Sequence, residues 1–140
     1  MQHIFVYGTL LSSEIVIKLT GKSFKTFAAV LPGYQLYRVK NYDYPAIIQY
    51  EGSVTKGLII RNADDSSLAV LSFYEGEEYE KKKVTVFVNG KPEIALTFVW
   101  TKEIEFLTDE RWDFQEFEKN SLEHYLNDVI PETLEVFFKK

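Results

Sequence analysis

The chain has 140 residues, of which 46% are hydrophobic and 16% aromatic, so it is long and apolar enough to form one domain with its own core. It has no cysteine and two histidines, which excludes disulfides, cysteine nucleophiles and a three-histidine metal site. The formal charge of −5 argues against nucleic acid as a partner, because phosphate binding needs clustered Lys and Arg. We find no signal peptide and no apolar run that could cross a membrane, and therefore expect a cytoplasmic protein.

The first part of the chain alternates short apolar runs with turn residues, which predicts several strands and one short helix. A strand at residues 4–7 is broken by Gly8-Thr9, and Ser12-Ser13-Glu14 can cap a helix that runs toward Leu19. The next apolar runs predict strands at residues 23–31, 35–39, 46–50 and 54–60. Their connections are expected to be a turn at Pro32-Gly33, a polar loop at residues 40–45 and a hairpin at residues 51–53.

The second part of the chain carries two helix signals around a predicted hairpin. Asp64 opens an N-cap cluster, and the helix after it ends near Gly76. Residues 84–88 alternate as a half-buried strand, and Asn89-Gly90 is typical of a tight turn from which residues 94–100 return antiparallel. The last expected elements are a helix at residues 109–128, a stop at Pro131 and a strand at residues 134–138.

These elements predict an α+β fold, because the strands follow one another as hairpins and not as regular strand–helix–strand units. A curved or closed, mostly antiparallel sheet is the preferred architecture. We expect residues 1–140 to form a single domain, in which residues 101–140 are a C-terminal helical extension.

Glu75 is the first candidate for chemistry. It follows Leu68 and Leu71 at helical spacing, so a carboxylate falls on the stripe that should face the core. Burial disfavours the charged form of a carboxylate and raises its pKa, and such a group can accept and return a proton near neutral pH. The alternative is that Glu75 is the last, water-exposed residue of its helix.

The second candidate is the loop Tyr7-Gly8-Thr9-Leu10, directly after the first strand. A glycine here lets a ligand come close to the backbone, and successive backbone N–H groups can form a nest for an anion. Such a nest would suit a small carboxylate substrate. The alternative is an ordinary connection between a strand and a helix.

Six short motifs follow one another between Ile4 and Trp100. They are Val6-Tyr7-Gly8-Thr9-Leu10, Leu31-Pro32-Gly33-Tyr34, Tyr44-Pro45, Val54-Thr55-Lys56-Gly57-Leu58, Phe73-Tyr74-Glu75-Gly76, and Tyr79-Glu80-Lys81 before Val84-Thr85-Val86. In this order they resemble the gamma-glutamylcyclotransferase-like superfamily, in particular its gamma-glutamylamine cyclotransferase and plant avirulence-induced-gene-like branch. The resemblance covers about two-thirds of the chain.

The resemblance implies a gamma-glutamylcyclotransferase-like fold, in which helices flank a small, mixed but mostly antiparallel β-barrel. It also implies a pocket between the loop at residues 7–10 and the helix that carries Glu75. In this family Glu75 would be the catalytic acid and base. The substrate-binding residues would be Tyr7, Gly8, Thr9 and Leu10, with Tyr79 and Lys81 in support.

The chain departs from the family pattern at three positions. Lys81 stands where relatives have Arg, which keeps the charge but loses the bidentate fork. Phe98 stands where relatives often have Tyr, and Ser72 where they often have an acidic residue.

The resemblance implies an enzyme that converts a gamma-glutamyl amine or gamma-glutamyl amino acid to 5-oxoproline and a free amine. One carboxylate can move both protons, so we expect no metal and no cofactor. The expected partner is a small gamma-glutamyl molecule, bound by a monomer or homodimer, with no nucleic acid or membrane involved. The alternative is a non-catalytic small-molecule binding module of the same fold.

Overall fold

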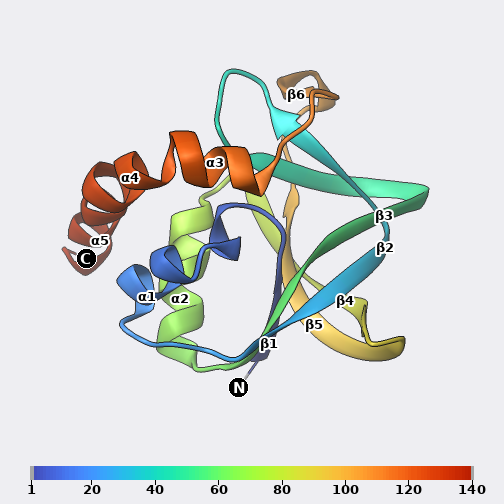
Figure 1. The fold of residues 1–140 in the computed structure, drawn as a ribbon, viewed down its shortest axis with the longest axis horizontal. Coiled ribbons are helices and arrows are strands. Elements are labelled where there is room, and N and C mark those ends of the chain that lie inside the picture. The colour runs from blue at the N-terminus through green and yellow to red at the C-terminus, as the bar shows by residue number, and fades with distance from the viewer. Residues whose placement is uncertain (1, 140) are drawn as a thin grey trace.

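The protein consists of a closed sheet with helices along one side (Figure 1). The computed structural model describes residues 2–139. The strands are β1 Gln2–Val6, β2 Thr26–Val39, β3 Pro45–Ala63, β4 Tyr79–Val88, β5 Lys91–Trp100 and β6 Leu107–Thr108. They pair in the order β3-β1-β5-β4-β2-β6, and β2 also pairs with β3. This last pairing returns the sheet to its first strand, so five strands form a ring. Only the β1–β5 pair is parallel, which confirms the expected mixed, mostly antiparallel α+β fold.

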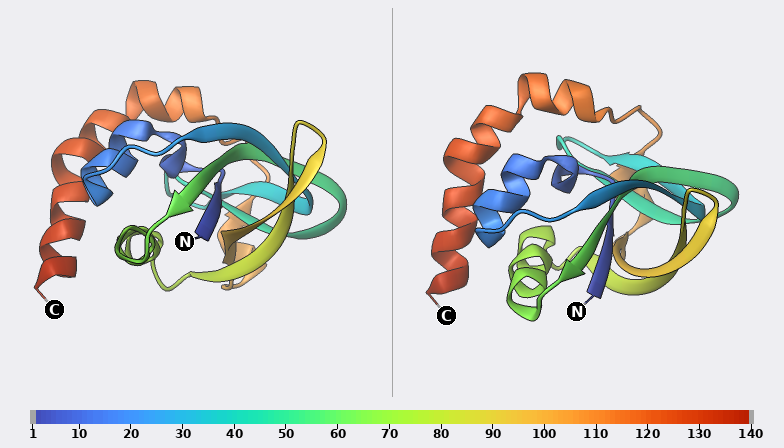
Figure 2. Two further views of the ribbon diagram at one scale, coloured as in Figure 1. Left: turned by 90° about the horizontal axis from the view of Figure 1, so that it is seen from below. Right: turned by 60° about the horizontal axis from the view of Figure 1, so that its bottom comes forward.

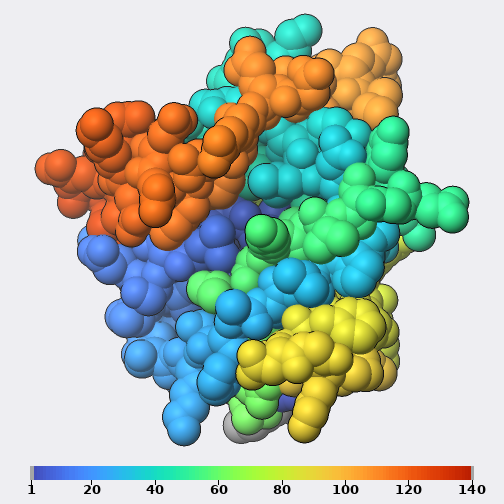
Figure 3. Space-filling view, turned by 45° about the vertical axis from the view of Figure 1, so that its right-hand side comes forward, coloured from blue at the N-terminus to red at the C-terminus, as the bar shows by residue number. Residues whose placement is uncertain are grey.

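The helices gather on one side of the sheet, where the C-terminal ones arch over α1 and α2 (Figures 1 and 2). They are α1 Ser13–Thr20, α2 Asp65–Glu75, α3 Phe114–Asn120, α4 Leu122–His124 and α5 Ile130–Phe138, with short 3₁₀ turns at Thr9–Leu11 and Ile104–Phe106 and a π-helical turn at Tyr125–Val129. Away from the helices, β2 and β3 lie at the surface between the C-terminal segment and the β4–β5 turn (Figure 3). In residues 2–139 every helix falls short of the length and hydropathy that crossing a bilayer requires.

Strand β1 is central because both of its faces are buried. Ile4 and Val6 belong to the core between sheet and helices, whereas Phe5 and Tyr7 belong to a second core inside the ring. Neighbouring residues of a strand point to opposite faces, so a strand between two cores is apolar throughout. This accounts for the continuous apolar run at the start of the sequence.

Two predicted turns in the β2–β3 region are wrong. Strand β2 continues through Pro32-Gly33, and β3 continues through residues 51–53. The two strands form one long hairpin, whose register shifts between Pro32 and Tyr34. Gly33 and Gly52 both have positive φ, at 84° and 91°. A glycine in this conformation can bend a strand within the ladder as well as end it, and here it bends the hairpin.

The predicted C-terminal elements also need correction. The helix expected at residues 109–128 begins only at Phe114, after its cap Asp113, and residues 134–138 are helical and not a strand. Pro131 does not stop the helix. The turn before it is π-helical, with the Ile130 N–H donating to the Tyr125 carbonyl. The wider turn accommodates a residue that lacks an N–H and whose ring would clash with the carbonyl four residues earlier.

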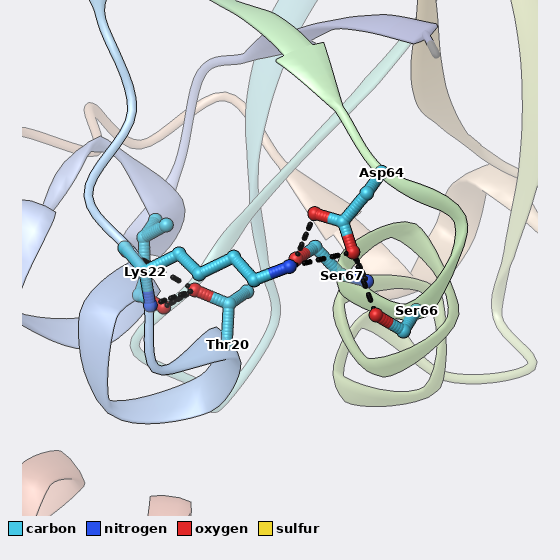
Figure 4. Close-up of polar contacts among 6 residues, drawn as sticks. Thr20, Lys22, Asp64, Ser66 and Ser67 are labelled. Carbon is cyan, nitrogen blue, oxygen red and sulfur yellow. Dashed lines mark hydrogen bonds and ion pairs between the residues drawn. The ribbon is translucent and has the colours of Figure 1, made fainter.

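The predicted cap of α2 is confirmed. The Asp64 carboxylate accepts hydrogen bonds from the Ser67 backbone N–H and from the Ser66 and Ser67 hydroxyls, at 3.3, 2.6 and 2.7 Å. Lys22, which follows α1, forms an ion pair of 3.0 Å with the same carboxylate (Figure 4). The cap therefore joins the start of α2 to the end of α1.

Asp64→Ala should lower the melting temperature at pH 7 by about 3–6 °C. The bonds from Ser66, Ser67 and Lys22 hold the pKa of the Asp64 carboxyl well below its ordinary value. A lowered pKa means that this stabilisation is present at neutral pH and is lost as the pH falls through the folded-state pKa. In thermal melts the difference between Asp64→Ala and wild type should therefore stay nearly constant from pH 7 to about pH 4 and shrink only below about pH 4. Asp65→Ala, at the exposed neighbour, is the control and should shift the melting temperature less.

Candidate active site

A pocket of about 210 Å³ opens beside the end of α2. Its lining brings together segments far apart in the sequence. The loop after β1 contributes Tyr7, Gly8 and Thr9, and the end of α2 contributes Tyr74, Glu75 and Gly76. Tyr44 lies just before β3, and the sheet contributes Pro45 and Tyr79. Five of the residues singled out from the sequence thus meet in one cavity, namely Tyr7, Gly8, Thr9, Glu75 and Tyr79.

Glu75 reaches the pocket because it is the last residue of α2. On the same helix Leu71 is fully buried and Leu68 packs against the core, so the predicted stripe does face inward. Gly76 follows with φ of 91° and ends the helix, and its N–H donates to the Ser72 carbonyl. The inward-facing side of α2 therefore packs in the apolar core at its leucines and lines the cavity at Glu75, which is only partly exposed.

Removal from water raises the pKa of the Glu75 carboxyl from 4.5 to about 8. None of the described residues that line the pocket is Lys, Arg or His, so no lining cation offsets the cost of its charge. At pH 7 the group is mostly protonated but keeps an ionised fraction. A carboxyl poised in this way can both accept and donate a proton.

The loop after β1 is held by its own side chains. The Tyr7 hydroxyl donates to the Phe98 carbonyl at 2.6 Å, and the Thr9 and Tyr74 hydroxyls share a hydrogen bond of 2.6 Å. The second bond links the loop to α2, one residue before Glu75. Leu10 does not line the pocket, because its side chain is 2% exposed and packs in the core between sheet and helices.

Gly8 has a steric reason to be glycine. Its φ of −121° is open to other residues, but a Cβ would lie 2.9 Å from Cγ of Pro45. The Pro45 carbonyl in turn accepts a hydrogen bond of 2.8 Å from the Tyr79 hydroxyl. Gly8, Pro45 and Tyr79 thus form one side of the cavity, and a larger residue at position 8 would push this side apart.

The two predicted supporting residues have different positions. Tyr79 lines the pocket, and burial raises the pKa of its hydroxyl well above the ordinary value. Lys81 lies on the exposed part of β4, opposite Phe98 of β5, and does not line the pocket. The position occupied by Arg in relatives thus contributes no charge to this cavity.

The C-terminal segment supplies lining residues that the sequence reasoning missed. Tyr125, Val129 and Thr133 reach the pocket from the π-helical turn and from α5. Burial, with the charges of Asp43 and Glu75, raises the pKa of Tyr125 to about 12. No local pattern marks these residues, because only tertiary packing brings them to Glu75. Phe5, Val6, Glu78 and Phe98, also unassigned to the site from sequence, complete the lining.

Clusters of three or more acidic or His side chains that could hold a metal ion are not found in residues 2–139. The described lining offers the carboxyls of Glu75 and Glu78, the hydroxyls of tyrosine and threonine side chains, and backbone groups.

Comparison with known proteins places this pocket in a family context. The family model described as "Gamma-glutamyl cyclotransferase, AIG2-like" matches residues 4–115. AIG2-like protein D of Arabidopsis thaliana is 31% identical over 129 residues, which cover 90% of this chain and 85% of that protein. Protein AIG2 C of the same plant is 29% identical over 117 residues, covering 82% of this chain and 71% of the relative.

Solved structures give the same result for the fold. A solution structure from Arabidopsis thaliana superposes with a TM-score of 0.70 at 26% identity, covering 96% of this chain and 82% of that one. A structure named gamma-glutamyl cyclotransferase superposes with a TM-score of 0.65 at 16% identity. The superposition covers 94% of this chain and 85% of that one. The sequence match spans four-fifths of the chain and includes the loop after β1 and the end of α2. The chain belongs to the AIG2-like gamma-glutamyl cyclotransferase family.

Proposed function

We propose that the protein is a cyclotransferase that converts a gamma-glutamyl amine or gamma-glutamyl amino acid to 5-oxoproline and a free amine. The observation that carries this proposal is the position of Glu75, a carboxyl with a pKa of about 8 in the pocket that the loop after β1 also lines. Family membership supports the same reaction class. We also propose that residues 1–140 form a single domain, in which residues 101–140 are a C-terminal helical extension that supplies Tyr125, Val129 and Thr133 to the pocket.

The proposed reaction is intramolecular. The ionised Glu75 carboxyl takes a proton from the substrate's α-ammonium, and the freed amine attacks the carbon of the substrate's own gamma-carbonyl. Glu75 then returns the proton to the leaving nitrogen, and the bond between this nitrogen and the gamma-carbon breaks. The ionised Glu75 next takes the second proton from the ring nitrogen and passes it to the departing amine, so that 5-oxoproline and a protonated amine separate. Because nucleophile and carbonyl belong to one molecule, holding the substrate bent supplies much of the rate.

The loop after β1 is proposed to hold the substrate's α-carboxylate through backbone N–H groups at Gly8, Thr9 and Leu10. None of the described lining residues carries a positive side chain, so an anion depends on neutral donors, and successive backbone N–H groups of a loop can supply them. Leu10 would act through its backbone alone, since its side chain lies in the core.

The test is incubation of the purified protein with a panel of gamma-glutamyl peptides and gamma-glutamyl amides, with 5-oxoproline measured by mass spectrometry. Release from any member supports the cyclotransferase. Binding without release from any member would leave the non-catalytic binding module.

Gly8→Val should weaken binding of a gamma-glutamyl ligand by at least about tenfold, because the added side chain displaces Pro45 and changes the loop backbone. Thr9→Ser keeps the hydroxyl that bonds Tyr74 and should change the affinity less than about threefold. Calorimetry with a gamma-glutamyl amide, in a Glu75→Gln background that prevents turnover, compares the two. Equal losses would contradict the role of the loop backbone.

A further inference from the structure

The two sides of the pocket differ in chemistry. The loop after β1 and the end of α2 contribute the Glu75 carboxyl together with hydroxyl and backbone groups, whereas the C-terminal segment contributes Tyr125, Val129 and Thr133 and no carboxyl. Tyr125, Val129 and Thr133 are all partly exposed, so they can contact a bound molecule. None of the three carries a formal charge at neutral pH.

The π-helical turn brings these three residues to one face. In an unbroken α-helix each residue turns about 100°, so residues eight apart are offset by about 80°. The wider turn between Tyr125 and Ile130 reduces this offset and lets Tyr125, Val129 and Thr133 line one cavity. The Thr133 hydroxyl donates to the Val129 carbonyl at 2.8 Å, so it is already used within the helix.

The wall formed by Tyr125, Val129 and Thr133 belongs to a C-terminal segment that is fixed to the rest of the protein at its start. At its start the Trp112 indole N–H donates to the Asp43 carbonyl at 2.9 Å, and the Ser121 hydroxyl bonds the Asp43 carboxylate. Asp43 directly precedes Tyr44-Pro45, which line the pocket. At its centre Tyr125 packs edge-on against Phe117, with ring centroids 4.9 Å apart. The wall is therefore part of a preformed cavity.

A gamma-glutamyl substrate has one end that carries an ammonium and a carboxylate, and a second end that leaves. The first end must lie at Glu75 and the loop after β1, where proton transfer and carboxylate binding are proposed. The leaving group then faces the C-terminal side of the pocket, where Tyr125, Val129 and Thr133 carry no cation to pair with a carboxylate and offer mainly apolar contacts. We infer that Tyr125, Val129 and Thr133 contact the leaving group and determine its size, an inference that rests on the proposed cyclisation.

The experiment varies Val129 and the length of the leaving group together. Substrates are gamma-glutamyl n-alkylamides from methyl to hexyl, and the readout is the ratio of kcat/KM for the hexylamide to that for the methylamide. Val129→Phe fills the cavity and should lower this ratio at least tenfold, whereas Val129→Ala should raise it. The matched control is Val136→Phe, a substitution of the same kind on α5 at a residue that is 53% exposed. It should leave the ratio at the wild-type value.

The outcomes separate this inference from the proposed function. If Val129→Phe lowers the kcat/KM ratio and Val129→Ala raises it, the inference that these residues contact the leaving group is supported. An unchanged ratio in both variants overturns the inference even if the enzyme is active. If wild type releases no 5-oxoproline from any gamma-glutamyl peptide or amide, the cyclotransferase proposal fails, and dissociation constants of the n-alkylamides are measured by calorimetry. If the alkyl length that binds most tightly differs between wild type and the Val129 variants, the inference that these residues contact the leaving group is still supported. If the preferred length is the same in all of them, or if no amide binds, the inference is overturned.

Discussion

Glu75→Gln is expected to abolish 5-oxoproline release, with a fall in rate of at least about 10²–10⁴-fold. The amide has nearly the shape of the carboxyl, so the pocket and the binding of substrate should survive. It cannot accept the α-ammonium proton, which is the step that makes the substrate amine a nucleophile. Turnover near the wild-type rate would end the assignment of Glu75 as the acid and base.

The wild-type pH profile gives a second readout of the same group. Because the proton is taken by the ionised form, kcat/KM should fall roughly tenfold per pH unit below about 8, where Glu75 is protonated in the free enzyme. A profile that stays flat from pH 6 to pH 8 would contradict this assignment.

The same variant should not lose stability. The folded-state pKa of Glu75 lies above its unfolded value, so the folded protein binds the proton more tightly. Stability therefore falls as the pH rises from about 4.5 to about 8, by on the order of 3 kcal/mol at pH 7. Glu75→Gln removes this loss, and its melting temperature should equal or exceed that of wild type at pH 7 to 8. The two curves should converge toward acid pH. A large drop in melting temperature would instead mean that Glu75 has a structural role.

Gly57→Ala is expected to be the most destabilising small change in the sheet. A Cβ at this position would meet the Val6 backbone carbonyl of β1, and the Phe5 ring lies 2.9 Å away. A backbone carbonyl cannot turn aside as a side chain can, and β1 has a core on each face. We expect the free energy of unfolding to fall by about 3 kcal/mol or more, measured by chemical denaturation.

Lys56→Ala is the control for this substitution, because its side chain is exposed on the same strand. It should change the free energy of unfolding by less than about 0.5 kcal/mol. If Gly57→Ala were as mild as Lys56→Ala, the close contact between β1 and β3 would not be a constraint on the fold.

Local signals explain what the sequence predicts well. The caps at Ser12 and Asp64 act within three residues, and Asn89-Gly90 has the positive φ values, 52° and 78°, that its hairpin turn needs. The inward stripe of α2 depends only on helical spacing. Glu75 could therefore be selected as the unusual residue before any contact was known.

The sequence predictions are wrong where the same residue type is compatible with two different local structures. Gly33 and Gly52 bend a strand with the same positive φ that would form a turn, and only pairing with the neighbouring strand decides between them. Pro131 is tolerated because a π-helical turn precedes it, and a π turn has no sequence pattern that could be recognised beforehand. The lining residues after position 101 belong to the same class, since tertiary contacts alone bring them to the pocket.

The central position of β1 has a consequence for the order of folding. The β2–β3 and β4–β5 hairpins join neighbouring stretches of chain and can form early, whereas β1 must find partners far along the sequence. Two hydrogen bonds between the β1 region and β5 join residues that lie far apart in the sequence. The Tyr7 hydroxyl, directly after β1, bonds the Phe98 carbonyl across 91 residues, and the Thr97 hydroxyl of β5 bonds the Phe5 carbonyl across 92. Closing so large a loop is slow, so β1 should dock after the hairpins. Pulse-labelled amide exchange during refolding should find the β1 amides protected last, and the loop that begins at Tyr7 can take its place in the pocket only at that step.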